Sequence, residues 1–272
     1  MKITKYPDGT SYVEVSLEDE TDPYTWTTFR INSYGDLWVL GQFVDAYNSF
    51  FHKKPNIYVP NLIDAQADRR FAHSQQHSLK LVCKFLNQMN ANFKVFHPHN
   101  PEVIEALIDN VIINTNAGFI NKVLDKLAPV DNLVMMSADA GGYKSVMKTA
   151  ETLRFRNDVI SASKSRSYFN GGTHLTQMLP DYDFKGKDVI IVDDISVYGG
   201  TFKGLSKLLR ETEVGKIYLA VSHMTVQNHK NSELYDAFDE VFTTNSKFEH
   251  YFVPFKKKNG GVQPKNLTII NI

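Results

Sequence analysis

Short apolar runs alternate with amphipathic stretches along most of this chain. Runs of strand length stand at 57–59, 93–96, 133–137, 159–162, 189–192, 216–222 and 240–243. Apolar residues at helical spacing stand between them, at 36–51, 74–89, 101–109, 143–153 and 232–238. Continuous apolar strands that alternate with amphipathic helices are typical of parallel sheets covered by helices. The pattern therefore predicts an α/β fold with mainly parallel sheets.

The same pattern predicts two domains. Residues 10–17 alternate and 26–31 form a second short strand, after a Pro-Asp-Gly turn at 7–9. Residues 127–132 lack periodicity, and the order of strand and helix restarts after them. We place a boundary there, which gives domains 1–129 and 130–272. Residues 163–179 are polar and poorly periodic, which predicts a mobile loop or a hairpin.

Charge and composition narrow the classes of function. Thirty basic and thirty acidic residues cancel, so the overall charge does not favour nucleic acid or an anionic membrane as a partner. No apolar run approaches the roughly 18 residues of a membrane span, and no secretory pattern opens the chain, so we expect a cytoplasmic protein. The lone Cys83 lies in a helical pattern, which predicts a small buried side chain and excludes an internal disulfide.

Residues 188–205 carry the most specific chemistry. An apolar run, 189–192, stops at Asp193 and Asp194, and a Gly-Gly-Thr loop then opens an amphipathic stretch. This order places backbone N–H groups and a helix N-terminus around a phosphate. Carboxylates at the strand tip can hold sugar hydroxyls, or a metal carried with the phosphate. A purely structural strand–turn–helix link is the alternative, and the Walker pattern is absent.

Residues 192–201 resemble the phosphoribosyl-pyrophosphate (PRPP) motif of type I phosphoribosyltransferases and of PRPP synthetases, the ribose-phosphate pyrophosphokinases. Further segments resemble synthetase motifs, in the same order along the chain: residues 6–9, 64–70, 96–100, 137–142, 163–166 and 244–246. The ordered set favours the synthetases. The resemblance implies two phosphoribosyltransferase-like domains, each a mainly parallel sheet flanked by helices.

The resemblance also implies a reaction. A PRPP synthetase transfers the β,γ-diphosphate of ATP, with Mg²⁺, to the anomeric hydroxyl of ribose 5-phosphate and releases AMP. Lys164 and Arg166 match the family's catalytic loop, where cations stabilise the transferred group. Such a polar segment suits a lid that closes over ATP. The implied partners are small-molecule substrates and further copies of the chain, with no nucleic acid or membrane.

The remaining site residues are assigned by the same matches. The ribose-phosphate site would comprise Asp193, Asp194, Val197, Tyr198, Gly199, Gly200 and Thr201. The ATP site would comprise Asp8, Gly9, Gln66, Asp68 and Arg69, with the Asp8 loop reaching a neighbouring subunit. His99 and Asp139 match the metal-associated positions of the family.

Several positions depart from the family pattern. Val197 stands where the phosphate loop usually has Asp, and Tyr198 follows it; His97 replaces another Asp, and Gln66 precedes Ala67 in place of Arg-Gln. One alternative is therefore the same chemistry on a larger acceptor such as ADP-ribose. Two others are a phosphoribosyltransferase that consumes PRPP and a non-catalytic regulatory paralogue.

Overall fold

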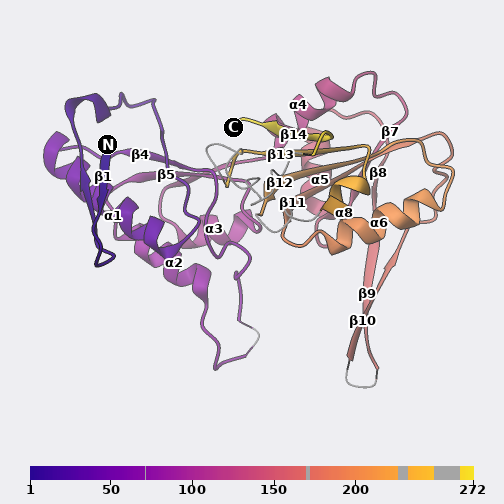
Figure 1. Ribbon diagram of the computed structural model, residues 1–272, viewed down its shortest axis with the longest axis horizontal. Coiled ribbons are helices and arrows are strands. Elements are labelled where there is room, and N and C mark those ends of the chain that lie inside the picture. The colour runs from indigo at the N-terminus through magenta and orange to yellow at the C-terminus, as the bar shows by residue number, and fades with distance from the viewer. Residues whose placement is uncertain (71, 170–171, 226–231, 248–263) are drawn as a thin grey trace. The chain divides into compact units, whose positions relative to one another are not determined.

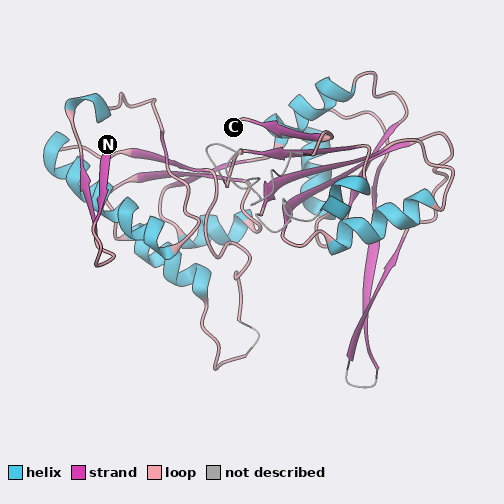
Figure 2. Ribbon diagram, viewed as in Figure 1, coloured by secondary structure: helices cyan, strands magenta, loops and turns pink. Residues whose placement is uncertain are grey.

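The computed structural model describes residues 1–70, 72–169, 172–225, 232–247 and 264–272, and for 166–169, 172–176 and 232 it describes only the backbone (Figure 1). The chain divides into two compact units, Met1–Asn114 and Thr115–Ile272. Each unit contains a parallel sheet flanked by helices, which confirms the predicted α/β fold class (Figure 2).

The first unit is built on a four-stranded parallel sheet in the order β3-β4-β5-β6. Its strands are β3 (Thr27–Thr28), β4 (Asn56–Val59), β5 (Asn92–Phe96) and β6 (Val111–Asn114). Its helices are α1 (Tyr34–Phe51), α2 (Ser78–Asn87) and α3 (Pro101–Leu107). All four residues of β4 are buried, which explains why its residues 57–59 form an apolar run without alternation.

Helix α1 illustrates how local sequence builds this unit. Ser33 and Asp36 form a capping box at its N-terminus. Its buried residues recur at helical spacing and form one face against the core: Leu37, Leu40, Phe43, Val44 and Tyr47. An antiparallel hairpin of β1 (Lys2–Lys5) and β2 (Ser11–Glu14) precedes it, followed by a short 3₁₀ turn, η1 (Leu17–Asp19).

The second unit is built on a six-stranded parallel sheet in the order β14-β13-β12-β11-β7-β8. Its strands are β7 (Leu133–Ser137), β8 (Val159–Ser161), β11 (Asp188–Ser196), β12 (Ile217–Met224), β13 (Glu240–Thr244) and β14 (Leu267–Ile270). Its helices are α4 (Ala117–Leu127), α5 (Tyr143–Thr152), α6 (Gly200–Arg210) and α8 (Ser232–Asp236). β12 is buried at all eight positions, as expected for an inner strand.

A two-stranded antiparallel arm extends away from this sheet (Figure 1). It consists of β9 (Ser163–Phe169) and β10 (Gly172–Met178). The sequence predicts a mobile loop or a hairpin over 163–179, and the backbone forms the hairpin.

The structural division falls at residue 114, earlier than the boundary expected between 129 and 130. The physical reason is α4, which belongs to the second unit. Thr149 in α5 donates a hydrogen bond of 2.7 Å to Asn116 at the start of α4, and Lys122 donates one of 3.0 Å to the carbonyl of Asn271. The sequence pattern does not predict α4 itself, nor β1, β6 and β14.

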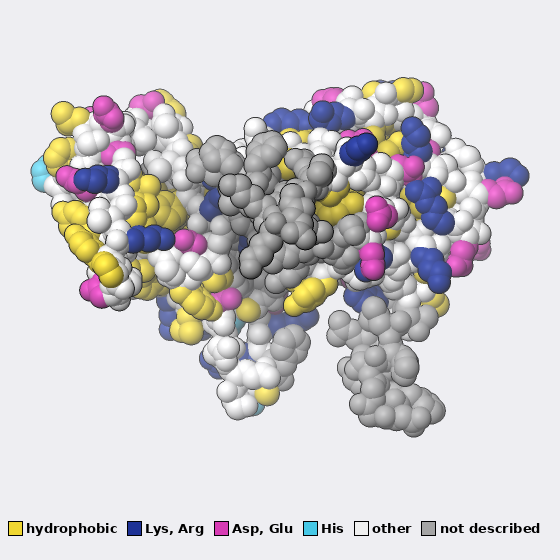
Figure 3. Space-filling model, in the orientation of Figure 1, with side chains coloured by type: hydrophobic (Ala, Val, Ile, Leu, Met, Phe, Trp, Pro, Cys, Tyr) yellow, Lys and Arg dark blue, Asp and Glu magenta, His cyan; other side chains and the backbone are white. Residues whose placement is uncertain are grey.

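Three compositional expectations can be compared with the structure. Cys83 is buried in α2, as predicted, and burial raises the pKa of its thiol to about 12. Basic and acidic side chains are interspersed on the face drawn in Figure 3. Within the described ranges, no helix is long and apolar enough to cross a membrane. The aromatic segment with three lysines at 251–258, whose composition predicts a solvated hairpin, lies outside the described residues.

The sheet of the first unit offers a matched test of the core. Ile57 in β4 is fully buried, whereas Ile112 in β6 is 52% exposed. We expect Ile57→Ala to lower the free energy of unfolding by about 2–5 kcal/mol, because it leaves a cavity, and Ile112→Ala by less than about 1 kcal/mol. Both tryptophans, Trp26 and Trp38, lie in this unit, so urea unfolding followed by tryptophan fluorescence reports it selectively. Equal losses for the two variants would contradict the assigned core.

Candidate active site

The two adjacent acids, Asp193 and Asp194, lie in a part of β11 that follows the end of its pairing with β7. Pairing with β7 ends at Val192 and Ser137, while pairing with β12 continues as far as Ser196 and Met224. Asp193 and Asp194 are therefore inside the strand and not at its tip, which corrects the position expected from sequence. The strand continues because β12 supplies hydrogen bonds to one edge after β7 has ended.

The loop that follows β7 lies next to these acids. Asp139 caps this loop, since its Oδ1 accepts hydrogen bonds from the N–H groups of Gly141 and Gly142 at 3.0 and 3.1 Å. A Cβ atom at Gly142 would lie 3.0 Å from Ser137 Oγ and 3.8 Å from Asp193 Oδ1. Glycine is needed there for close approach of the backbone. The structure thus brings together Asp139 and Asp193, which sequence assigns to different ligands.

Electrostatics at this edge of the sheet are unfavourable for a free carboxylate. Burial raises the pKa of Asp193 well above its usual value of 3.8, and the negative charges of Asp194 and Asp139 raise it further. A hydrogen bond of 2.9 Å from the Asp194 N–H to Asp193 Oδ1 opposes part of this effect. Hydroxyl donors or a cation would relieve the repulsion among these carboxylates.

The segment 197–201 is a loop that leads into the N-terminus of α6, and its role as a phosphate loop stays a prediction. Gly199 has φ +74°, a left-handed conformation that favours glycine, and it precedes the first residue of α6. Among the described residues no side chain caps α6, and uncapped N–H groups at a helix N-terminus can hold an anion. Thr225 anchors the loop, since its N–H donates to the Ser196 carbonyl at 3.1 Å and its Oγ1 to the Val197 carbonyl at 2.9 Å.

Lys164 reaches this loop from the arm. Its Nζ donates a hydrogen bond of 3.2 Å to Thr201 Oγ1, in the first turn of α6. Arg166 lies two positions later on β9, so the two residues share a face of the strand. The structure therefore joins a predicted catalytic residue to the predicted phosphate loop. Tyr198, in the same loop, is 72% exposed.

In the first unit, two predicted segments meet. Asn100 Nδ2 donates a hydrogen bond of 3.1 Å to Asp68 Oδ2, and Asn100 Oδ1 also caps α3 by accepting from the Val103 N–H. This contact brings the loop of Gln66, Asp68 and Arg69 to the residues that follow His99. His99 is exposed, whereas the neighbouring His97 is buried and donates its N–H to the Asn114 carbonyl at 2.7 Å.

Asp8 and Gly9 form the turn of the N-terminal hairpin. Thr10 donates to Asp8 Oδ1 through its N–H at 3.0 Å and its Oγ1 at 2.7 Å. These hydrogen bonds from Thr10 lower the pKa of the exposed Asp8 carboxyl. Gly9 has φ +89°, which the turn requires. Both residues are exposed, and their role at an ATP site stays a prediction.

The metal assignments also stay predictions. His99 belongs to the first unit and Asp139 to the second. In the part of the chain that the structure describes, no group of three or more His, Cys, Asp or Glu side chains is arranged to hold a metal ion. Mg²⁺ usually takes only one or two protein carboxylates, with water and substrate phosphates as its other ligands.

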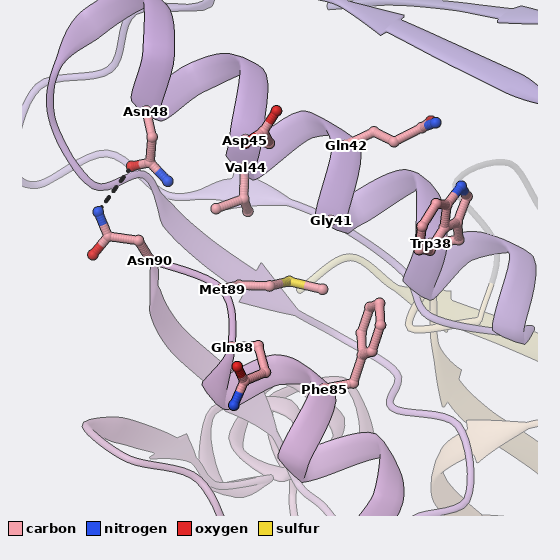
Figure 4. A pocket seen from close by; sticks show the side chains of 10 residues that line it. All are labelled: Trp38, Gly41, Gln42, Val44, Asp45, Asn48, Phe85, Gln88, Met89 and Asn90. Carbon is pink, nitrogen blue, oxygen red and sulfur yellow. Dashed lines mark hydrogen bonds between the residues drawn. The ribbon is translucent and has the colours of Figure 1, made fainter.

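A cavity of about 500 Å³ lies between α1 and α2 (Figure 4). Trp38, Phe85 and Met89 form its apolar part, and Gln42, Asn48 and Asn90 contribute polar groups. None of the site residues predicted from sequence lines it. Cavity size therefore does not indicate where the predicted chemistry takes place.

Comparison with known proteins gives an independent view of the chain. The phosphoribosyl transferase domain matches residues 107–258. The ribose-phosphate pyrophosphokinase of Thermococcus kodakarensis is 28% identical over 255 residues, covering 90% of this chain and 85% of that protein. The enzyme of the same name from Mycoplasma genitalium is 25% identical over 266 residues, covering 94% and 78%.

A solved structure also shares the fold. The phosphoribosylpyrophosphate synthetase from Mycobacterium smegmatis matches with a TM-score of 0.75 at 20% identity. The match covers 100% of this chain and 85% of that one. This likeness supports the fold with its phosphoribosyltransferase-type sheets.

The raised pKa of Asp193 leads to a prediction about stability. A carboxyl whose pKa is raised by folding contributes stability below its unfolded value, near 3.8, and loses that contribution as the pH rises through the folded-state pKa. We therefore expect ligand-free Asp193→Asn to melt a few degrees higher than the parent at pH 7, with the difference shrinking toward pH 4. Thermal scans across this range test it, with the exposed Asp181→Asn as a control that should melt like the parent. A lower melting temperature for Asp193→Asn at pH 7 would contradict the prediction.

Proposed function

The chain belongs to the phosphoribosyl transferase domain family, and we propose that within it this enzyme is a ribose-phosphate diphosphokinase. The proposed reaction moves the β,γ-diphosphate of ATP to the anomeric hydroxyl of ribose 5-phosphate, giving PRPP and AMP. The similarity to ribose-phosphate pyrophosphokinases over about nine-tenths of the chain confirms the resemblance seen in the motifs and supports this choice.

One observation carries the proposal most directly: Lys164 contacts the predicted phosphate loop. Its ammonium group lies 3.2 Å from Thr201 Oγ1, beside the N-terminus of α6. A phosphorylated sugar bound at this N-terminus would therefore have a cation next to it. Binding of a phosphate would account for a loop that ends at a helix N-terminus. Transfer of a diphosphate also needs cations around the transferred group. The contact links these two requirements.

The acceptor would be oriented by β11 and α6. The N–H groups at the start of α6, from Gly200 and Thr201, would hold the 5-phosphate, and Asp193 and Asp194 would accept hydrogen bonds from ribose hydroxyls. Both interactions would be favourable, since no described side chain caps the N-terminus of α6 and the neighbouring carboxylates repel one another. Val197, Tyr198 and Gly199 would form the part of the phosphate loop that precedes α6.

The transfer itself would be a direct displacement at phosphorus. The bond from the anomeric oxygen to the β-phosphorus forms while the bond from that phosphorus to the α–β bridging oxygen breaks. AMP leaves with the bridging oxygen, and the proton of the anomeric hydroxyl is released to water. Negative charge on the transferred oxygens would be balanced by Lys164 and Arg166, the latter through its planar guanidinium. Mg²⁺ would supply further charge neutralisation across the phosphates, and His99 and Asp139 are the residues proposed to help hold it.

ATP would be held by the loops of the first unit. Gln66, Asp68 and Arg69 lie in one segment, and the Asp68–Asn100 hydrogen bond fixes this segment against the loop that carries His99. Asp8 and Gly9 would contribute from the hairpin turn of a second copy of the chain. The enzyme would then act as a homo-oligomer in nucleotide biosynthesis.

Replacement of the lysine tests the proposed chemistry. We expect the parent enzyme to release AMP from ATP with Mg²⁺ and ribose 5-phosphate, and Lys164→Ala to lower kcat at least about 100-fold, because a cation acting on the transition state is lost. The control is Lys185→Ala, which removes an exposed lysine paired with Glu213 and should leave kcat unchanged. AMP is measured by chromatography with mass detection.

The acceptor is tested in the same assay. ADP-ribose replaces ribose 5-phosphate in a parallel reaction, since Val197 and the exposed Tyr198 could suit a larger ribose phosphate. Release of AMP with ADP-ribose alone would overturn the proposed acceptor and keep the chemistry. No AMP with either acceptor would overturn the proposed function.

A further inference from the structure

We propose that Gln177 is a positioning residue that holds Lys164 against the first turn of α6, and that Gly204 provides the space for its side chain. The catalytic consequence of this contact rests on the proposed function. The contact itself rests on the register of the arm, on two hydrogen bonds to Thr201 and on the packing at Gly204.

The register of the arm places the two residues side by side. Gln177 in β10 lies directly opposite Lys164 in β9. Residues that face each other across an antiparallel pair project from the same side of the ribbon, with Cβ atoms about 5 Å apart. Both side chains then reach the same residue. Gln177 Nε2 donates to the Thr201 carbonyl at 2.9 Å, and Lys164 Nζ donates to Thr201 Oγ1 at 3.2 Å.

Gly204 explains how the glutamine can approach the helix. It lies inside α6, three residues after Thr201 and so about one turn further along the same face. A Cβ atom at position 204 would overlap Gln177 Oε1 and would lie 3.2 Å from its Cδ. Glycine inside a helix is less favourable than alanine by about 1 kcal/mol. The amide of Gln177 occupies the space that the missing side chain leaves, which accounts for a glycine at position 204.

Gly118 in α4 provides the contrast. It also lies within a helix, but among the described residues a Cβ atom there would meet no atom within 4 Å, apart from its chain neighbours and its own helix backbone. Side chains are therefore tolerated at 118 and excluded at 204 while Gln177 keeps its place. The difference between the two glycines isolates the contact with the arm from the general effect of a helical glycine.

Electrostatics explain why Lys164 needs such a neighbour. A cation beside the N-terminus of a helix is repelled by the helix dipole until an anion binds between them. An isolated two-stranded arm is also only marginally stable in water, so its position depends on its anchors. Gln177 is a neutral anchor, because its amide bonds to a carbonyl that can accept a second hydrogen bond. It would hold the ammonium group in place before phosphate arrives, which is preorganisation of a catalytic charge.

Two substitutions remove the contact in different ways. Gln177→Met keeps the length of the side chain and removes the amide, whereas Gly204→Ala keeps the glutamine and fills its space. Gly118→Ala is the matched control. The first readout does not depend on enzyme activity. It is the rate of amine labelling of Lys164 in the ligand-free protein, measured by mass spectrometry. The side chain of Lys2, which is 76% exposed, is the internal reference. We expect both variants to label Lys164 about five times faster than the parent, and Gly118→Ala to label it at the parental rate.

The second readout is kinetic and separates a positioning role from a structural one. We expect Gln177→Met to lower kcat about five- to tenfold, the effect of one lost hydrogen bond, with the KM for ribose 5-phosphate changed less than about twofold. In a Lys164→Ala background, Gln177→Met should cause no further loss, because its effect passes through the lysine. Gly118→Ala should match the parent in both kinetic constants.

Each outcome has a defined meaning. Unchanged labelling of Lys164 in both variants overturns the proposed contact, whatever the activity. Faster labelling with a full additional loss of kcat in the Lys164→Ala background overturns the positioning role. Absence of AMP release by the parent overturns the proposed function, and the labelling rates then decide the contact independently.

Discussion

The candidate site depends on the unequal lengths of neighbouring parallel strands. β7 ends at Ser137, and β11 continues beside β12 to Ser196. This difference leaves one edge of β11 open over Asp193 and Asp194, and the loop after β7 folds back toward it through Gly142. Carboxyl ends of parallel strands are where open α/β sheets bind ligands. Here the extra length of one strand places two carboxylates, a glycine-rich loop and a helix N-terminus at the same edge.

The features of this edge are individually unfavourable in the absence of a ligand. Burial and neighbouring charges raise the pKa of Asp193, the N–H groups of α6 have no side-chain cap, and Lys164 lies beside the positive end of that helix. A phosphorylated sugar would bring hydroxyl donors to Asp193, and its phosphate would bring an anion to the N–H groups of α6 and to Lys164. A ribose phosphate, the acceptor we propose, would therefore offset the unfavourable features of the ligand-free site.

Features that depend on adjacent residues can be predicted from the sequence. The apolar run at 133–137 is the strand β7, and the Gly-Gly-Thr segment opens α6 as expected. Features that depend on pairing with a distant segment cannot be predicted in this way. The sequence predicts Asp193 and Asp194 at a strand tip, because local sequence does not show that β12 continues the pairing. Gln177 gave no signal at all, since its role follows from the register of β9 and β10. The domain boundary was displaced because the contacts of α4, and not its own pattern, assign it to the second unit.

The central claim is that the segment from Asp193 to Thr201 holds the ribose phosphate, while ATP binds elsewhere. A crystal structure of the enzyme with ribose 5-phosphate, Mg²⁺ and a non-hydrolysable ATP analogue tests it most directly. The account predicts the 5-phosphate on the backbone N–H groups at the start of α6, ribose hydroxyls on Asp193 and Asp194, and the anomeric oxygen facing Lys164. Triphosphate bound in that loop, or ribose 5-phosphate bound away from β11, would contradict it.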